Sequence, residues 1–235
     1  MCYNNFVWGD NILSKVLFTI NDGKIEEVSN DLVEIRKEVI LYTTKWEFLS
    51  TDLFALNNLV NEFLNVNKKY IISYSNMPLE KLVVNLLHKK KLTISFCESC
   101  TGGMLASTLV NVSGSSNVFN ESFVTYSNEA KIKHLGVNKG TIEKYSVYSP
   151  EVAEEMALGL YNKTLANVCV SITGRAGGDE FTEGDGTYDF AIVINIDDYN
   201  YIHVEHSSLT GSRNEVRKMQ TTYIFYRIYQ LLERI

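Results

Sequence analysis

The sequence predicts an α/β protein with a three-layer α/β/α sandwich at residues 77–235, preceded by a small α+β domain at residues 1–76. From Pro78 onward, short apolar segments typical of buried strands alternate with segments of helical periodicity, the pattern of helices packed on a sheet. Before residue 75 the pattern differs, with short strand-like segments around one helix-like segment. The 235 residues are 45% apolar, which is enough for a sizeable core in a folded protein.

The N-terminal domain is expected to contain a hairpin. Residues 16–20 and 24–28 flank Asn21-Asp22-Gly23, a sequence typical of tight hairpin turns. Residues 38–42 form another short apolar segment, residues 46–64 have apolar side chains at helical spacing, and residues 70–72 predict a strand. No catalytic grouping is visible here, and nothing decides between a role in oligomerisation and one in partner docking.

The C-terminal domain is expected to alternate helices with strands. The predicted helices cover 79–90, 102–112, 129–135, 150–165 and 211–232, and the predicted strands cover 92–96, 119–126, 168–172, 187–196 and 201–205. Loops at the carboxyl ends of strands are where sites form in such folds. Three loops that follow strands are therefore the candidates.

Composition excludes several classes of partner. The net charge is −6, whereas nucleic acids and anionic membranes require clustered positive charge. No stretch of about 18 apolar residues predicts a transmembrane helix, and no signal peptide is visible. Four cysteines are too few for a disulfide framework. We therefore expect a cytoplasmic protein without a nucleic-acid or membrane partner.

The first loop, residues 97–103, joins a buried strand to a helix and reads Cys-Glu-Ser-Cys-Thr-Gly-Gly. A hydroxyl here lies at the positive end of the following helix, where the N–H groups of Gly102 and Gly103 are candidate donors to an oxyanion. The alternative is an ordinary helix cap by Ser99 or Thr101. Cys97 and Cys100 also form a C-x-x-C pair, for which buried core cysteines are favoured over a redox or zinc site, because no histidine lies at zinc-like spacing.

Two further loops carry polar groups. Gly114-Ser115-Ser116 can bind an anion through N–H groups and hydroxyls, and downstream Ser127 or Asn128 can cap the short helix that carries Lys131. The third loop begins at Thr173-Gly174-Arg175 and is rich in glycine and acidic residues, but it matches neither phosphate-binding glycine motif.

Together these loops resemble one family. The matching segments are Glu-Ser-Cys-Thr-Gly-Gly at 98–103, Gly-Ser-Ser at 114–116, Tyr-Ser-Asn-x-x-Lys at 126–131, Leu-Gly-Val at 135–137, Val-Tyr-Ser at 147–149, Met-Ala at 156–157 and Thr-Gly-x-Ala-Gly at 173–177. They occur in the order found in the CinA C-terminal domain family, the nicotinamide mononucleotide deamidases. The resemblance covers about residues 78–235.

The resemblance implies a homo-oligomeric serine/lysine amidohydrolase that converts nicotinamide mononucleotide to nicotinate mononucleotide and ammonia without a metal or other cofactor. It implies Ser99 as nucleophile, Lys131 as general base and Tyr126 beside them. The residues expected to bind the substrate are Thr101, Gly102, Gly103, Ser115, Ser116, Thr173, Gly174, Arg175 and Arg213.

The third loop departs from the family pattern. The family usually has Thr-Gly-Ile-Ala-Gly-Pro-Gly-Gly, whereas this chain has Arg175 in place of the isoleucine and no proline. Added acidic residues repel a phosphate, and Arg175 can compensate as a phosphate clamp. A nucleotide-binding or regulatory protein without turnover, an amidohydrolase for another pyridine nucleotide and a C-x-x-C oxidoreductase remain alternatives.

The proposed chemistry sets a requirement on Lys131. A lysine base must be neutral near pH 7, so its pKa must fall by about 3 units, at a cost of about 4 kcal/mol that burial or a nearby cation can impose. A neighbouring carboxylate would act in the opposite direction. We therefore expect Glu98 to point away from Lys131, toward backbone N–H groups.

Overall fold

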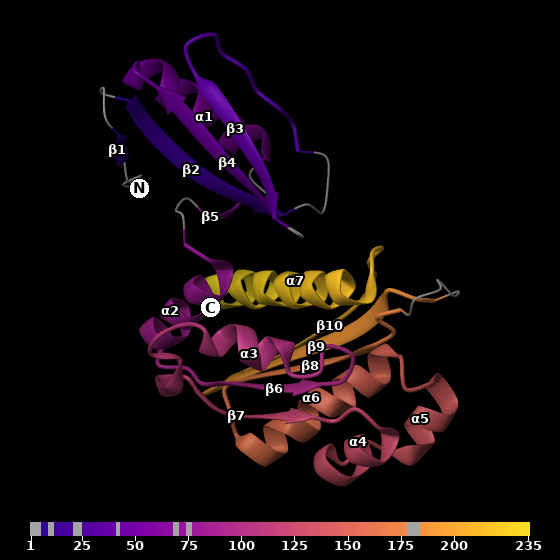
Figure 1. Cartoon of the computed structure of the whole chain (residues 1–235). Helices are drawn as coiled ribbons and strands as arrows, with labels where there is room; N and C mark the ends of the chain where they lie inside the picture. Colours follow the sequence, from indigo (N-terminus) through magenta and orange to yellow (C-terminus); the bar gives the residue numbers. More distant parts are fainter. Residues whose placement is uncertain are drawn as a thin grey trace. The chain divides into compact units, whose positions relative to one another are not determined.

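The computed structural model describes residues 6–8, 12–20, 25–40, 43–67, 71–73, 77–177 and 184–235. The chain divides into two compact units, Met1–Leu79 and Glu80–Ile235 (Figure 1). Of the candidate boundary at residues 75–78, residues 75 and 76 lie outside the described part of the chain. Each unit has its own sheet and its own core.

The first unit is an antiparallel sheet with one described helix. Its strands are β1 (Phe6–Trp8), β2 (Ile12–Ile20), β3 (Glu34–Ile40), β4 (Thr43–Ser50) and β5 (Ile71–Ser73), in the order β1-β2-β4-β3 with β5 also pairing with β2. Helix α1 (Leu53–Asn67) buries Leu56, Leu59, Val60 and Phe63. The ring of Phe63 packs against those of Trp46 and Phe48.

Two predictions for this unit are wrong. Residues 46–50 belong to strand β4 and not to a helix, because Trp46 and Phe48 alternate with more exposed neighbours and face α1 from the sheet. Residues 25–28 form no strand, and β2 pairs with β4 instead of with a following strand. The turn predicted at 21–23 lies outside the described residues.

The second unit has a mixed five-stranded sheet in the order β10-β9-β8-β6-β7. The strands are β6 (Ile94–Glu98), β7 (Phe119–Val124), β8 (Val168–Gly174), β9 (Thr187–Ile196) and β10 (Tyr199–Ser208). Strand β6 is parallel to both β7 and β8, whereas β8, β9 and β10 are antiparallel. The α/β class is confirmed.

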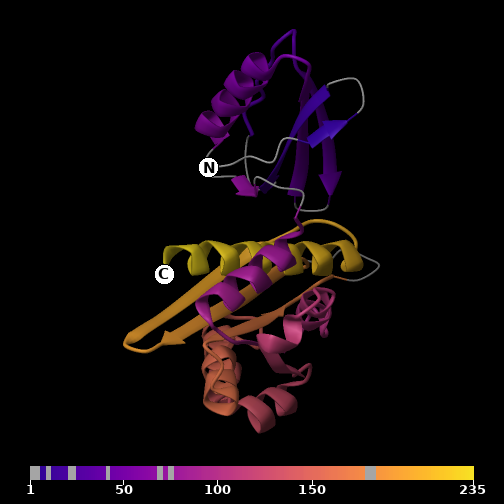
Figure 2. The same ribbon diagram turned by 90° about the vertical axis from the view of Figure 1, so that its left-hand side faces the viewer.

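Helices cover both faces of this sheet (Figures 1 and 2). On one face lie α2 (Leu79–Lys90), α3 (Met104–Val110) and α7 (Arg213–Arg234); on the other lie α4 (Asn128–Leu135), α5 (Lys139–Tyr145) and α6 (Pro150–Thr164). The short helix α5 and the 3-10 turn η2 (Ser115–Asn117) were not predicted. The prediction for α2 is confirmed residue for residue.

The site's position follows from this topology. The carboxyl ends of the parallel strands β6, β7 and β8 lie at one edge of the sheet, and the loops that follow them meet there. Strands β6 and β8 are buried along their whole length. The loops after β6 and β8 therefore extend from fully buried strands.

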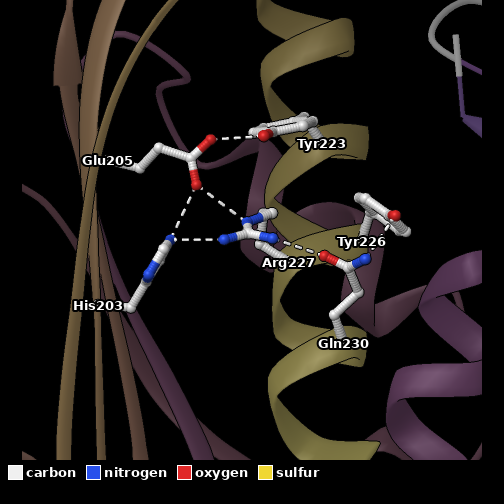
Figure 3. Close-up of polar contacts among 6 residues, drawn as sticks. All are labelled: His203, Glu205, Tyr223, Tyr226, Arg227 and Gln230. Carbon is white, nitrogen blue, oxygen red and sulfur yellow. Dashed lines mark hydrogen bonds and ion pairs between the residues drawn. The ribbon is translucent and has the colours of Figure 1, made fainter. Parts of the chain in front are cut away.

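Helix α7 is fixed to edge strand β10 by a half-buried polar network (Figure 3). The Glu205 carboxylate accepts hydrogen bonds from Tyr223 Oη and from Arg227 Nε, the latter at 2.9 Å. His203 Nε2 lies 2.8 Å from the same carboxylate, and Arg227 Nη1 donates to Gln230 at 2.6 Å. These contacts fix the position of α7 across the sheet face.

Candidate functional site

A cavity of about 210 Å³ opens at the carboxyl end of the parallel strands. It brings together parts of the first loop, the start of α4, the third loop and the first turn of α7. Its lining residues are Ser99, Cys100, Tyr126, Asn128, Lys131, Val147, Tyr148, Gly174, Arg175, Ala176, Gly177, Asp185 and Arg213.

Ser99 and Lys131 face each other in this cavity although 32 positions separate them. Lys131 Nζ lies 3.0 Å from Ser99 Oγ. Ser99 directly follows β6, and its N–H donates to the Ile172 carbonyl of β8. Lys131 lies one turn into α4, whose N-terminus is capped by Ser127. Its side chain thus points back along the helix toward the strand ends.

The Lys131 amine is almost completely enclosed, with 1% of the residue exposed. Burial lowers the pKa of Lys131 to about 8. Its other partners are the carbonyls of Thr125 and Tyr126, at 2.8 and 3.2 Å. An amine in this environment is neutral in a substantial fraction of molecules near pH 8, which is what a general base requires.

Glu98 points away from this amine, which confirms the expectation. Its carboxylate accepts hydrogen bonds from the N–H groups of Gly103, Leu105 and Ala106 at 2.9–3.0 Å. A buried carboxylate thus occupies the positive end of α3, where the helix dipole and free N–H groups stabilise negative charge. Neither Ser99 nor Thr101 caps this helix, which begins after Gly103.

This arrangement corrects the expected oxyanion site. Gly103 N–H donates to Glu98, and Gly102 N–H donates to the Ser99 carbonyl at 3.1 Å. The two groups are therefore engaged inside the turn and do not face an oxyanion. These hydrogen bonds hold the turn that carries Ser99.

Arg213 and Tyr126 form a second polar pair at the cavity. Arg213 Nη2 donates to Tyr126 Oη at 3.2 Å, and Arg213 Nη1 donates to the Gly177 carbonyl. The guanidinium thereby connects the first turn of α7 with the ends of β7 and β8. It places a permanent positive charge beside a phenol in the same cavity as Ser99.

The third loop contributes an ion pair. Arg175 Nη2 lies 3.6 Å from Asp185 Oδ1, and the Asp185 side chain is 8% exposed. Both residues line the cavity. The main-chain groups of Arg175 also bond to Thr187 and Gly186, which holds the two ends of the loop together. Burial is the main cause of the lowered pKa of Lys131.

Several expected binding residues do not line this cavity. Gly174, Arg175 and Arg213 line it, whereas Thr101, Gly102, Gly103, Ser115, Ser116 and Thr173 do not. Thr173 is fully buried and donates to the Val147 carbonyl at 2.9 Å. Ser115 is also buried, in η2. The sequence of each loop did not show which of its side chains point into the cavity.

The cysteine pair is buried. Cys97 Sγ contacts the Met156 carbonyl at 3.4 Å and Cys100 Sγ contacts Gln220 Oε1 at 3.6 Å, so the thiols have different partners. Burial raises the pKa of Cys100 to about 12. Within the described residues, no group of three or more His, Cys, Asp or Glu side chains is arranged to hold a metal ion. The described helices include none that is long and apolar enough to cross a bilayer.

The family model of the CinA C-terminal domain matches residues 76–232. The chain belongs to this family. A putative competence-damage inducible protein of Alkaliphilus oremlandii is 45% identical over 166 residues, which cover 70% of this chain and 38% of that protein. A CinA-like protein of Petrotoga mobilis is 40% identical over 178 residues, covering 75% of this chain and 43% of that protein. The chain thus spans less than half the length of these relatives.

Solved CinA structures share the fold of the second unit. A CinA superfamily protein from Klebsiella pneumoniae aligns with a TM-score of 0.62 at 26% identity, covering 67% of this chain and 97% of that chain. One from Escherichia coli aligns with a TM-score of 0.57 at 32% identity, covering 73% and 99%. A Caldicellulosiruptor saccharolyticus relative matches 89% of this chain, so that similarity reaches into the first unit.

Two residues at the site, Asp185 and Arg217, were not predicted from the sequence. Asp185 was noted only as one of several acids, but it is the acid that faces Arg175. Arg217 was not noted, yet its guanidinium contacts the Ser99 turn. Its position four residues after Arg213 places both on one face of a helix, and this spacing is the signal that could have found it.

Proposed function

We propose that this protein is a metal-independent serine/lysine amidohydrolase that deamidates nicotinamide mononucleotide to nicotinate mononucleotide and ammonia. The observation that carries the proposal is the 3.0 Å approach of Lys131 Nζ to Ser99 Oγ in a cavity where the pKa of that lysine is lowered to about 8. Family membership supports the substrate class.

The proton inventory of Lys131 supports a base role. A neutral amine has two N–H donors and one lone pair. The carbonyls of Thr125 and Tyr126 accept the two hydrogens, which leaves the lone pair for the hydroxyl of Ser99. Proton transfer from that hydroxyl gives an ammonium with three partners already in place. The site therefore accommodates both states of the base without rearrangement.

The reaction then follows in balanced steps. Ser99 Oγ forms a bond to the amide carbon as its proton moves to Lys131 Nζ. The tetrahedral intermediate breaks its C–N bond, and Lys131 returns the proton to the leaving nitrogen, which departs as ammonia. Water attacks the resulting ester in the same way and releases the carboxylate. Arg213 and Tyr126 are the side chains that we assign to the anionic groups of the substrate.

Ammonia release by wild type and by Ser99→Ala tests this proposal. We expect turnover by wild type and a loss of at least about 1,000-fold in the variant, because removal of an activated nucleophile has effects of this size. Retained turnover in Ser99→Ala would exclude the serine mechanism. A panel of other pyridine nucleotides tests the substrate assignment separately.

A nucleotide-binding protein without turnover is the second candidate. It is favoured by the Arg175–Asp185 pair, which places charges in the cavity where the family usually has an isoleucine at position 175. Calorimetric binding of nicotinamide mononucleotide without ammonia release would support this candidate. Light scattering would test the homo-oligomeric state that we propose from family membership.

A further inference from the structure

The turn that carries Ser99 is held by a cation from α7. Arg217 Nε donates to the Cys100 carbonyl at 3.1 Å, and Arg217 Nη2 donates to the Thr101 carbonyl at 2.7 Å. The third nitrogen, Nη1, donates to Asn214 Oδ1 at 3.0 Å on the same helix. Every nitrogen of the guanidinium is therefore engaged, and two of the three fix consecutive carbonyls directly after Ser99.

These carbonyls need such a partner. Cys100 and Thr101 are buried and lie between strand β6 and helix α3, so their carbonyls are outside the regular hydrogen bonds of the sheet and the helix. The next two residues, Gly102 and Gly103, have φ values of 61° and 95°. Glycine can adopt these positive φ values without strain, but a turn with two glycines has more backbone conformations open to it unless other contacts fix it. The planar fork of an arginine removes that freedom because it fixes both distance and direction.

A carboxylate holds the other end of the same turn. Glu98 accepts three N–H bonds from the beginning of α3, while Arg217 donates to the carbonyls between Ser99 and that helix. Ser99 thus sits between an anion that binds N–H groups and a cation that binds carbonyls. Neither Glu98 nor Arg217 is among the residues that line the described cavity.

We propose that Arg217 is a positioning residue of the amidohydrolase, which keeps Ser99 Oγ in place for Lys131 by fixing the carbonyls of Cys100 and Thr101. The inference rests on the proposed function. It also assigns a double task to α7, because Arg213, one turn earlier, lines the cavity itself. Helix α7 thereby contacts the turn that carries Ser99 through Arg217 and lines the cavity through Arg213, so it fixes the position of these two parts of the site relative to each other.

The test compares Arg217→Met and Arg217→Lys with Arg227→Met. Arg227 is a matched control because it lies on the same helix, ten positions after Arg217, and makes its contacts with Glu205 and Gln230 (Figure 3). We expect Arg217→Met to lower kcat for nicotinamide mononucleotide about 10- to 100-fold with KM changed less than about threefold, as for small misplacements of a reacting group. Arg217→Lys should recover part of kcat, since a lysine can reach one carbonyl at a time.

A second measurement does not depend on the substrate. The rate at which a fluorophosphonate modifies Ser99 should fall in Arg217→Met in parallel with kcat. Hydrogen exchange should increase in peptides covering 98–106 in Arg217→Met, and in peptides covering 199–208 in Arg227→Met. Equal losses in both variants, or unchanged exchange over 98–106, would overturn the proposal.

The outcomes separate the two claims. If wild type reacts with the fluorophosphonate but releases no ammonia, the substrate assignment fails, while the effect of Arg217→Met on the modification rate still decides the role of Arg217. If wild-type Ser99 does not react with the fluorophosphonate and no ammonia is released, both claims are overturned.

Discussion

The two walls of the cavity are built differently. On one wall, Ser99 and Lys131 are buried, and their polar atoms contact neighbouring strand ends and each other. On the other wall, Arg175 is 41% exposed in its side chain and faces Asp185 across a longer gap of 3.6 Å. The side chains of the first wall are buried and held by these contacts, whereas Arg175 on the second wall is partly exposed to solvent. We propose that the first wall carries out the chemistry and that the second contributes to substrate recognition.

The largest expected effect tests the first wall. Lys131→Met should lower turnover about 100- to 10,000-fold, the usual contribution of a positioned general base. In wild type, kcat/KM should rise with pH and level off above about pH 8, because burial lowers the pKa of Lys131 to about 8 and only the neutral amine accepts the serine proton. Lys133→Met, at an exposed position of the same helix, is the control and should keep near-native turnover. A flat pH profile between 7 and 9 would contradict the assignment.

The second effect concerns stability. The pKa of Lys131 is about 8 in the folded protein and 10.5 in an ordinary lysine, so between these values the unfolded chain binds more protons than the folded one. Stability of wild type relative to Lys131→Met should therefore rise as pH increases from 8 toward 10.5, by about 3 kcal/mol in total. Urea denaturation of both proteins at pH 7.5 and pH 10 measures this difference. A difference that falls with pH would show that the amine is not desolvated.

The pairing of Ser99 with Lys131 was predicted through the family resemblance, because the residues around Ser99 alone left an ordinary helix cap as an alternative. Strand β6 is buried throughout, Gly102 and Gly103 have positive φ values in the turn, and Ser127 caps the helix that carries Lys131. The partners that fix the turn could not be predicted, since Arg217 comes from a helix more than 100 positions later. Long-range contacts also explain the wrong helix prediction at Trp46 and Phe48. The apolar spacing there is compatible with a helix, but β4 pairs with β2 and β3, which belong to other segments of the chain, and forms a strand.

The second wall offers a smaller effect. Arg175→Ile should raise KM for nicotinamide mononucleotide about tenfold, because Asp185 then loses the Arg175 cation that offsets its repulsion of the substrate phosphate, an electrostatic effect of about 1 kcal/mol. The double variant Arg175→Ile with Asp185→Val should return KM to within about threefold of wild type. Arg175→Lys, which keeps the charge, is the control. Additive effects of the two substitutions would show that the pair does not act as a unit.

The smallest effect is expected at Cys100, which lines the cavity but has no part in the proposed reaction. Burial raises the pKa of its thiol to about 12, so the reactive thiolate is scarce at pH 7–9. Its sulfur contacts Gln220, a partner that a serine hydroxyl can also reach. Cys100→Ser should therefore change turnover less than about threefold, an effect below about 1 kcal/mol, as should Cys97→Ser. Loss of activity in Cys100→Ser together with retention in Ser99→Ala would instead assign the nucleophile to the thiol, because the two side chains occupy the same turn and differ in which atom carries the reactive electron pair.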